Sequence, residues 1–357
     1  MKCDVAIVGA GIAGAGLAAA LAPHARVVVL EAEGTPGYHA TGRSAAFWSE
    51  TYGGPAIQPL TTASGGALRD GGFLQPLGAL NIGRERDRPA VERLLTEFDG
   101  SGVELIPVDP AAHLPGLRPE WTLGVLEPSC AYIDVAGLHA RFQAGVGRAG
   151  AVLLTDAAVE RATREGGVWR VETRAATVTA DVLVDAAGAW ADAVAERAGV
   201  RPLGVRAYRR TMVQLRTDPP APDSMPHVAD IAGHFYFKPE PGGRLWLSPH
   251  DEVPTDPCDA APEELDVAVA IDRFEGAVDW RVAAVERRWA GLRSFAPDRL
   301  PAFGFDAHAP GFFWCAGQGG FGIQTAPAAS DLCAALILNR AVPHGLDPHR
   351  YTPARFA

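Results

Sequence analysis

The sequence predicts an α/β fold with a discontinuous Rossmann-like domain and a second domain that contains an antiparallel β-sheet. Three observations support this prediction. A strand, a glycine-rich turn and a helix open the chain. Similar strand and helix patterns return after residue 150 and again after residue 310, while the segments between them alternate apolar and polar residues.

The first unit runs from Val5 to Glu31 and reads as strand, turn, helix and strand. Gly9, Gly11 and Gly14 form the pattern G-x-G-x-x-G where the strand meets the helix. In that context the first glycine permits a tight turn, the second lets backbone approach a pyrophosphate, and the third lets the helix pack on the sheet. The amides at the helix N-terminus would face the phosphates. The unit therefore predicts a dinucleotide site.

Glu31 directly follows the second strand of this unit, VVVL. A carboxylate there can accept both hydroxyls of an adenosine ribose, and it repels a 2′-phosphate. FAD or NAD is therefore expected rather than NADP. The apolar run from Val5 to Ala22 also resembles a signal peptide or a membrane span, but its glycines and the acid after it argue against both. No other long apolar run occurs, so no membrane span is expected.

Composition limits the function classes. The 357 residues suffice for two domains, and a net charge of −10 without a basic cluster argues against a nucleic-acid partner. Five cysteines, an odd number without C-x-x-C spacing, fit neither a disulfide framework nor a zinc site. The histidines show no metal-ligand spacing, so no metal is expected. A reducing compartment, the cytoplasm, is the simplest expectation.

The later elements repeat the opening theme. Residues 151–188 read as a strand, a hairpin and the strand VLVDAAGAW, and a helix opens near Trp190 and Asp192. Residues 311–338 read as an aromatic strand, a second glycine-rich turn and a helix. Two glycine-rich turns that each lead into a helix N-terminus could hold the two ends of one long ligand.

Residues from about 73 to 130 and from about 204 to 287 carry the alternating pattern of half-buried antiparallel strands. They are expected to form a sheet that covers the nucleotide domain. The predicted limits are 1–72, 131–203 and 288–357 for the nucleotide-binding domain, and 73–130 and 204–287 for the substrate-binding domain.

Five motifs in this order resemble the family of D-amino acid oxidase and glycine oxidase: GAGIAG with Glu31, GYHATGRSAA, VLVDAAGAW, WAGLRSF and GQGGFGIQT. The resemblance runs from residue 3 to about 335, and within the family it is closest to the bacterial D-arginine dehydrogenases. It implies the glutathione-reductase-type FAD fold and non-covalent FAD. It also implies oxidation of a carbon–nitrogen bond next to a carboxylate, with hydride passing from the α-carbon to flavin N5 and an imino acid released for hydrolysis.

The resemblance also implies which residues bind FAD. The first glycine turn would cradle the pyrophosphate, Glu31 and Ala32 would hold the ribose, Val159 would contact the adenine, and the last segment would place amides at the flavin's pyrimidine edge. These residues are Gly9, Ala10, Gly11, Ile12, Ala13, Gly14, Glu31, Ala32, Thr41, Gly42, Arg43, Ser44, Ala45, Ala46, Val159, Ala187, Gly188, Trp190, Gly320, Phe321, Gly322, Ile323, Gln324 and Thr325.

Five residues are expected at the reaction site. Arg210 and Arg293 match positions that hold the substrate carboxylate in the family, Tyr236 adds a hydrogen bond to it, Tyr52 lies near the α-amine, and Gly320 belongs to the glycine turn. Side chains alternate along a strand, so the adjacent Arg209 should point away from the cavity. The simpler explanations are core packing for the tyrosines and a surface salt bridge for Arg293.

Two departures from the arginine-specific relatives affect the substrate. Phe47 stands where they have a histidine, and Ala79, or Gly78 in a shifted alignment, stands where they have the glutamate that holds a cationic side chain. An apolar wall cannot offset the desolvation of a guanidinium. We therefore expect a D-amino acid with an uncharged, apolar or aromatic side chain that binds with a neutral amine, and activity that rises with pH.

Other functions remain open. The same carboxylate clamp suits a secondary amine such as glycine, sarcosine or proline, or a 2-hydroxy acid. An electron-transfer flavoprotein subunit and an NAD-dependent dehydrogenase are further alternatives, although the first has no use for an anion clamp and the second lacks a catalytic constellation. Cys315 lies in an apolar strand and is expected to be an inert thiol, not a flavin link. The electron acceptor is either O₂ or quinone-like.

Overall fold

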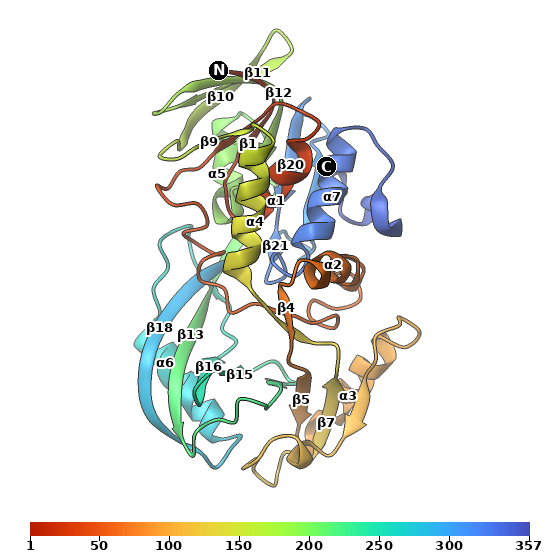
Figure 1. Cartoon of the computed structure of the whole chain (residues 1–357), viewed down its shortest axis with the longest axis vertical. Coiled ribbons are helices and arrows are strands. Elements are labelled where there is room, and N and C mark those ends of the chain that lie inside the picture. Colours follow the sequence, from red (N-terminus) through yellow and green to blue (C-terminus); the bar gives the residue numbers. More distant parts are fainter.

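The computed structural model describes residues 1–357 and divides into two halves along its long axis (Figure 1). Both termini lie in the upper half, which is built on an eight-stranded sheet. The lower half is built on a ten-stranded sheet, and a small three-stranded sheet forms a third unit. The chain passes between the halves several times, so neither half is one continuous segment.

The upper sheet has the order β10-β11-β12-β1-β2-β9, and β20 lies between β12 and β19. β1, β2, β9, β12 and β20 pair in parallel, while β10, β11 and β19 join in antiparallel fashion. The bounds are β1 Lys2–Val8, β2 Val27–Leu30, β9 Val152–Leu154, β10 Val159–Glu165, β11 Val168–Thr173, β12 Thr177–Asp185, β19 Ala302–Phe305 and β20 Phe312–Ala316. This parallel core confirms the predicted Rossmann-like domain.

Helices cover this sheet. On one face α1 packs against α4 and α7, and α2 packs on α7. Their apolar side chains join those of β1, β2 and β20 in one core cluster. α5 packs on the opposite face against β10 and β12. The bounds are α1 Ile12–Leu21, α2 Gln58–Asp70, α4 Val135–Arg148, α5 Ala191–Arg197 and α7 Ala326–Ile337.

The lower sheet has the order β21-β18-β13-β16-β15-β14-β5-β7-β6, with β17 beside β13. It is mostly antiparallel, but β14 and β5 pair in parallel. α6 (Glu264–Glu275) covers one face through Val267, Ala270 and Phe274. The strands are β5 Ala79–Gly83, β6 Ile106–Val108, β7 Leu123–Glu127, β13 Arg206–Asp218, β14 His227–Asp230, β15 Tyr236–Glu240, β16 Arg244–Ser248, β17 Val253–Pro254, β18 Arg281–Phe295 and β21 Gln318–Gly319.

A three-stranded sheet, with the order β3-β8-β4, connects the two halves. Its strands are β3 Phe47–Trp48, β4 Leu74–Pro76 and β8 Ala131–Ile133. α3 (Arg88–Glu97) lies at the outer edge beside β7 (Figure 1). Six short 3₁₀ turns complete the structure: Glu85–Asp87, Pro110–Ala112, Gly188–Trp190, Pro343–Gly345, Pro348–Arg350 and Pro353–Phe356.

Two details differ from the strand pattern expected for the second domain. The segments expected as strands also contain the helices α3 and α6, because the apolar residues of α6 recur at helical spacing and pack on the sheet. β18 stays paired with β13 up to Phe295, so the predicted limit at 287 falls inside a continuous strand.

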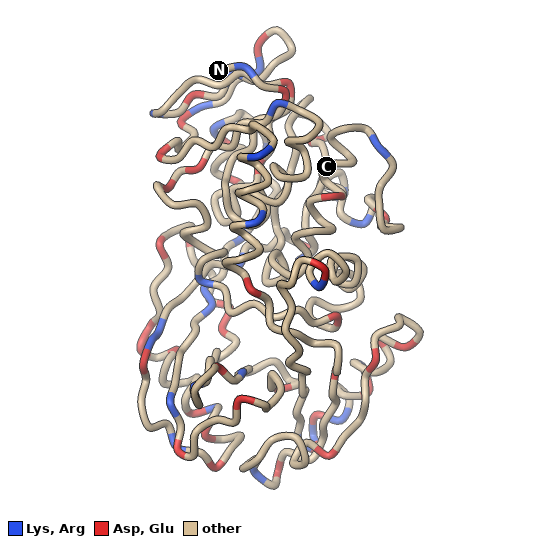
Figure 2. Tube along the Cα trace, viewed as in Figure 1, with Lys and Arg blue, Asp and Glu red and all other residues tan.

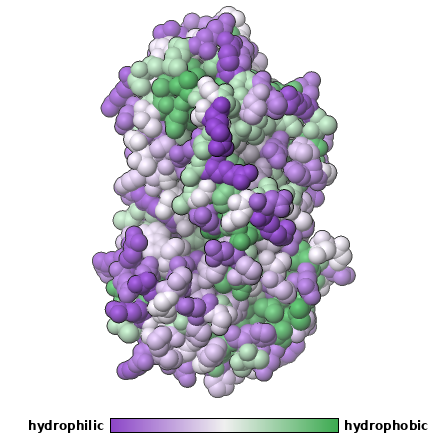
Figure 3. All heavy atoms as spheres, viewed as in Figure 1, coloured by the Kyte–Doolittle hydropathy of each residue, from purple (hydrophilic) through white to green (hydrophobic).

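The surface is mixed in character. Lys and Arg are interspersed with Asp and Glu in both halves (Figure 2). On the face seen in Figure 3, apolar residues form small groups between polar ones. None of the helices combines the length and the apolar character needed to cross a membrane.

Candidate active site

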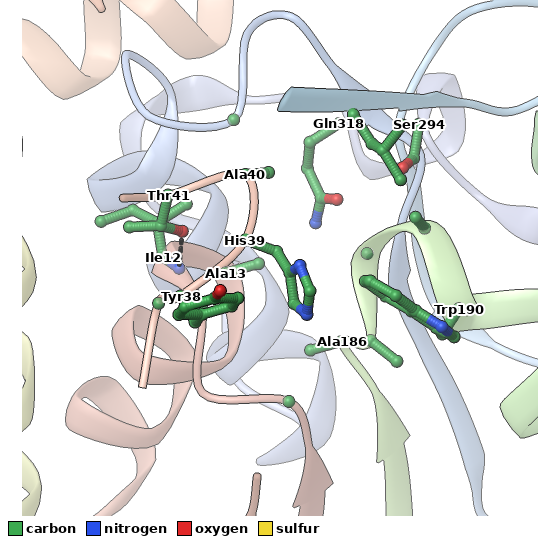
Figure 4. A pocket seen from close by; sticks show the side chains of 18 of the residues that line it. Ile12, Ala13, Tyr38, His39, Ala40, Thr41, Ala186, Trp190, Ser294 and Gln318 are labelled. Carbon is green, nitrogen blue, oxygen red and sulfur yellow. Dashed lines mark hydrogen bonds between the residues drawn. The ribbon is translucent and has the colours of Figure 1, made fainter. Parts of the chain in front are cut away.

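A cavity of about 430 Å³ extends from the upper sheet to the lower one. It begins at the turn after β1 and runs along the segment of residues 30–44 (Figure 4). Two other walls are formed by residues 157–159, where β10 begins, and by the turn at residues 186–190. It ends against β13, β18 and the glycine turn of residues 318–323. Two glycine-rich turns thus contribute to one long site, as the sequence predicted.

Two glycines of the first glycine turn, Gly9 and Gly14, have no room for a side chain. A Cβ on Gly9, whose φ is +100°, would lie 2.5 Å from the carbonyl oxygen of Ala186. A Cβ on Gly14 would lie 1.9 Å from the carbonyl oxygen of Gly9. The two glycines therefore let β1, β12 and α1 approach one another, and the N-terminus of α1 opens on the cavity.

The segment that follows β2 supports this helix end. The Ile12 amide donates to Thr41 Oγ1 at 3.0 Å, drawn as the dashed line in Figure 4. Glu31 lies in the cavity wall with only 8% of its surface exposed. Its Oε2 accepts from the Ala10 amide at 2.7 Å and its Oε1 from the Glu33 amide at 3.0 Å. These two bonds hold the carboxylate in place at the edge of the cavity.

Most of the sequence-predicted cofactor residues line the cavity. Those that do are Gly9, Gly11, Ile12, Ala13, Glu31, Ala32, Thr41, Arg43, Ser44, Val159, Ala187, Gly188, Trp190, Gly320, Gly322 and Ile323. The remaining ones are not among the lining residues. They are Ala10, Gly14, Gly42, Ala45, Ala46, Phe321, Gln324 and Thr325.

Sequence reasoning gave no role to His39, although His39 belongs to the GYHATGRSAA motif. Its ring extends into the cavity opposite Trp190 (Figure 4), and the ring centroids are 4.5 Å apart. His39 Nε2 lies 2.8 Å from Glu33 Oε1. Tyr38 and Gln318 also line the cavity without having been predicted. A motif gives the order of residues but does not reveal which of its side chains turn inward.

At the lower end of the cavity, β13 presents Arg210, which is 3% exposed. Its Nε donates to the carbonyl oxygen of Asp251 at 2.7 Å and its Nη2 to Glu252 Oε1 at 3.3 Å. Its Nη1 is buried without a partner. Arg209 points the other way and pairs with Glu263 and Asp266 beside α6, as strand alternation predicted. Arg210 is therefore fixed in place and keeps one free donor.

Arg293 of β18 lines the same end of the cavity. Its Nη1 donates to Tyr52 Oη at 3.0 Å, and it makes no salt bridge. Gly320 lies directly against this pair: a Cβ there would be 2.4 Å from Tyr52 Oη and 2.8 Å from Arg293 Nη1. Arg210 and Arg293 thus form a cationic end wall, which suits an anion of the size of a carboxylate.

Tyr236, on β15, is 7% exposed and lies behind this wall. Its hydroxyl donates to Met212 Sδ at 3.3 Å, and Met212 lines the cavity. Burial alone would raise the pKa of Tyr236, but the nearby Arg293 and Arg210 lower it. Tyr236, which was expected to bond the substrate carboxylate, is thus not itself a lining residue of the cavity, whereas its partner Met212 is.

Phe47 stands among aromatic rings at the far side of the site. Its ring centroid is 5.2 Å from that of Tyr52, 4.2 Å from that of His227 and 6.3 Å from that of Tyr236. On the other side of Tyr236 lies His250, at 5.5 Å. Sequence reasoning missed both histidines, because a single histidine in a strand or a loop carries no spacing signal.

Glu127 and Gln324 hold the Tyr52 segment. Glu127 is fully buried and accepts from Thr51 Oγ1 at 2.6 Å, from the Glu50 amide at 2.7 Å and from Ser49 Oγ at 2.8 Å. Gln324 Nε2 donates to the carbonyl oxygen of Tyr52 at 3.0 Å. The segment that positions Tyr52 is thus tied both to β7 and to the turn before α7.

Curated relatives match most of this chain at low identity. The bifunctional protein MnmC of tRNA 5-methylaminomethyl-2-thiouridine biosynthesis from Polaromonas naphthalenivorans is 26% identical over 94% of this chain and 57% of its own length. Human mitochondrial sarcosine dehydrogenase is 27% identical over 78% of this chain and 32% of its own length. The chain thus spans about half or less of the length of these relatives.

Solved structures share the fold. Glycine oxidase from Geobacillus kaustophilus superposes with a TM-score of 0.85 at 24% identity, covering 99% of each chain. L-proline dehydrogenase from P. horikoshii superposes with a TM-score of 0.88 at 22% identity, covering 99% of this chain and 98% of its own.

The family model for FAD dependent oxidoreductases (DAO) matches residues 4–336. The cavity fits that cofactor: the glycine turn leaves space for a pyrophosphate at the N-terminus of α1, and the fixed Glu31 carboxylate suits a ribose with free hydroxyls. The chain therefore belongs to the family of FAD-dependent oxidoreductases.

Proposed function

We propose that this protein oxidises the carbon–nitrogen bond next to the carboxylate of a small amino acid, with glycine, sarcosine and proline as the leading substrate type. The observation that carries this proposal is the cationic end wall, where Arg210 keeps one unpaired donor and Arg293 makes no salt bridge. The names of similar proteins, sarcosine dehydrogenase, glycine oxidase and L-proline dehydrogenase, support a substrate of this type.

In this proposal the protein's residues bind and orient the substrate. FAD, when bound, takes up the hydride from the substrate carbon. The guanidinium groups of Arg210 and Arg293 hold the carboxylate, and Tyr52 steadies Arg293 through its hydroxyl. Gly320 keeps the backbone of the C-terminal turn close to this pair, since any side chain there would collide with it.

The residue types near the wall also bear on the charge of the substrate amine. Two arginines disfavour a neighbouring ammonium, and Phe47 offers no acceptor for its proton. The substrate should therefore bind with a neutral amine. Turnover at low substrate concentration should rise with pH over the range in which the free amine loses its proton.

A D-amino acid with an uncharged side chain is a second candidate. Ala79 is buried at 5% exposure and gives no carboxylate to a cationic side chain. Glu127 lies opposite Ala79 in the sheet register, but its oxygens already accept from Ser49, Glu50 and Thr51. D-arginine and D-lysine are therefore expected to be poor substrates, because their charge would be buried without a partner.

Anaerobic mixing of the flavin-loaded protein with single compounds tests both candidates. The panel contains glycine, sarcosine, L- and D-proline, neutral D- and L-amino acids, D-arginine and 2-hydroxy acids, and bleaching of the flavin absorbance is followed. Bleaching by the secondary amines or by glycine supports the leading proposal, and bleaching by D-amino acids alone supports the second. Bleaching by 2-hydroxy acids alone, or by no member, would refute both. Adding O₂ or a quinone then identifies the electron acceptor.

A further inference from the structure

The side chain of His227 is buried without a hydrogen-bond partner. It is 3% exposed, and neither Nδ1 nor Nε2 has a partner within the protein. Buried polar groups are almost always hydrogen-bonded, because an unpaired one keeps its full desolvation cost. An imidazole in this state therefore points to a partner that the protein itself does not supply.

His227 lies on the face of the lower sheet that carries the substrate wall. It is on β14 next to Ala79 of β5, and its ring is 4.2 Å from Phe47 and 5.6 Å from Tyr236. Phe47 follows directly on the segment of residues 41–46 that runs beside the cavity. The imidazole therefore lies one ring away from the cavity, since Tyr236 donates its hydroxyl to the cavity-lining Met212.

The other polar side chains of this face already have partners. Lys238 Nζ bonds Glu240 Oε1 at 2.7 Å between the rings of Tyr132 and Trp246. His250 Nδ1 lies 2.7 Å from the carbonyl oxygen of Gly233. Only Arg210 Nη1 and the two ring nitrogens of His227 are buried and unpaired on this face. Arg210 Nη1 suits the substrate carboxylate, so the ring nitrogens of His227 suit another part of the same molecule.

We propose that His227 determines substrate specificity by donating a ring N–H to a neutral oxygen in the part of the substrate distal to the α-carbon, such as that of a carboxamide or a hydroxyl. This inference rests on the proposed function, because it places the substrate carboxylate at Arg210 and Arg293. It narrows the proposed substrate to a relative of glycine, sarcosine or proline that carries such an oxygen, which these three compounds themselves lack, and it changes the expectation of a purely apolar side chain. The substrate would instead pair a short apolar stem, lying on Phe47, with an oxygen at its end.

The protonation state agrees with this role. Burial, together with Lys238 and His250, lowers the pKa of His227 to about 3, so the ring is neutral at physiological pH. A neutral imidazole carries one N–H donor and one acceptor nitrogen. It can therefore bind a neutral oxygen without burying a net charge.

The experiment compares pairs of compounds of equal shape that differ in one oxygen-bearing group. Asparagine and leucine form one pair in each enantiomer, and N-(carbamoylmethyl)glycine and N-isobutylglycine form a secondary-amine pair. Wild type, His227→Phe and His227→Gln are loaded with FAD, and kcat/KM is measured for each compound. His227→Phe keeps the ring that packs on Phe47, and His227→Gln keeps an N–H donor. His234→Phe, a partly exposed histidine of the same domain, is the control.

Wild type should favour the oxygen-bearing member of at least one pair. His227→Phe should lose about 5- to 100-fold for that member, the range of one buried hydrogen bond, and less than about 3-fold for its apolar partner. His227→Gln should recover most of the loss. Equal effects on both members, or no effect on either, would overturn the inference and indicate a ring that merely packs or binds water.

Binding of inert analogues separates this inference from the proposed function. Succinamate and 4-methylpentanoate are the deaminated forms of asparagine and leucine, and neither can be oxidised at a carbon–nitrogen bond. Their dissociation constants are read from the change in flavin absorbance. If no panel compound bleaches the flavin, the proposed function fails, but a preference for succinamate that is lost in His227→Phe would still support the inference. Equal binding of the two analogues by wild type and His227→Phe would refute it.

Discussion

Replacing Arg210 by methionine should remove carboxylate binding while leaving FAD in place. The side chain is 3% exposed, two of its nitrogens are held by Asp251 and Glu252, and Nη1 is free to meet the substrate. Loss of one partner of a buried, hydrogen-bonded charge pair costs about 2–5 kcal/mol. This corresponds to a fall of about 30- to 5000-fold in the affinity for a substrate carboxylate.

Arg209 provides a matched control for this prediction. It is the neighbouring arginine on the same strand and is also buried, but it pairs with Glu263 and Asp266 on the far side of the sheet. Arg209→Met should lower stability and leave kcat/KM within about 3-fold of wild type, since Arg209 does not reach the cavity.

The assay is stopped-flow reduction of the flavin together with titration of an inert carboxylate. FAD content and the denaturation midpoint are measured for each variant, so that loss of fold is distinguished from loss of binding. The reasoning is refuted if Arg210→Met still binds the carboxylate with wild-type affinity. It is equally refuted if Arg209→Met and Arg210→Met lower kcat/KM by the same factor.

Three further predictions follow from other contacts. Gly320→Ala should raise KM at least about 10-fold with FAD retained, because its Cβ would lie 2.4 Å from Tyr52 Oη; unchanged steady-state kinetics would contradict this. Glu31→Ala should weaken FAD binding at least about 10-fold in a flavin-fluorescence titration, since it removes a fixed ribose acceptor; full FAD retention would argue against that role. Unfolded His227 takes up a proton below about pH 6.5, whereas the folded form does so only near pH 3. Lowering the pH from 7 to 5 should therefore reduce the free energy of unfolding, measured by urea denaturation, by about 2 kcal/mol more in wild type than in His227→Phe. Parallel pH profiles of the two proteins would contradict this prediction.

The glycine turn of the upper half could be predicted from the sequence because its residue types and spacing have a steric reason. Gly9 and Gly14 occur where any Cβ would collide with backbone, so the residue type itself reveals the turn. Strand alternation required that only one of Arg209 and Arg210 enter the cavity, and the family resemblance selected Arg210. In each case the signal lay in a short stretch of sequence, although the atom that excludes a side chain at Gly9 belongs to Ala186, directly after β12.

The lower half was less predictable because its contacts join distant segments. α6 was missed since its run of valine and alanine also suits a strand, and only its packing on the sheet selects the helix. His227 meets Phe47 from another part of the chain, and nothing near either residue predicts that contact. Glu127 likewise finds its partners 76 to 78 residues away. Such pairs follow from topology, which a single sequence specifies only indirectly.

The attachment of residues 49–51 to Glu127 has a consequence for how this enzyme could be changed. Those residues follow β3 of the three-stranded sheet, whereas Glu127 ends β7 of the lower sheet. The lower sheet therefore cannot be exchanged as an independent unit. A transplanted sheet without an acid at this place would release Tyr52 and, through it, Arg293. Recombination between relatives should succeed only where the donor sheet brings a carboxylate that can receive the same three donors.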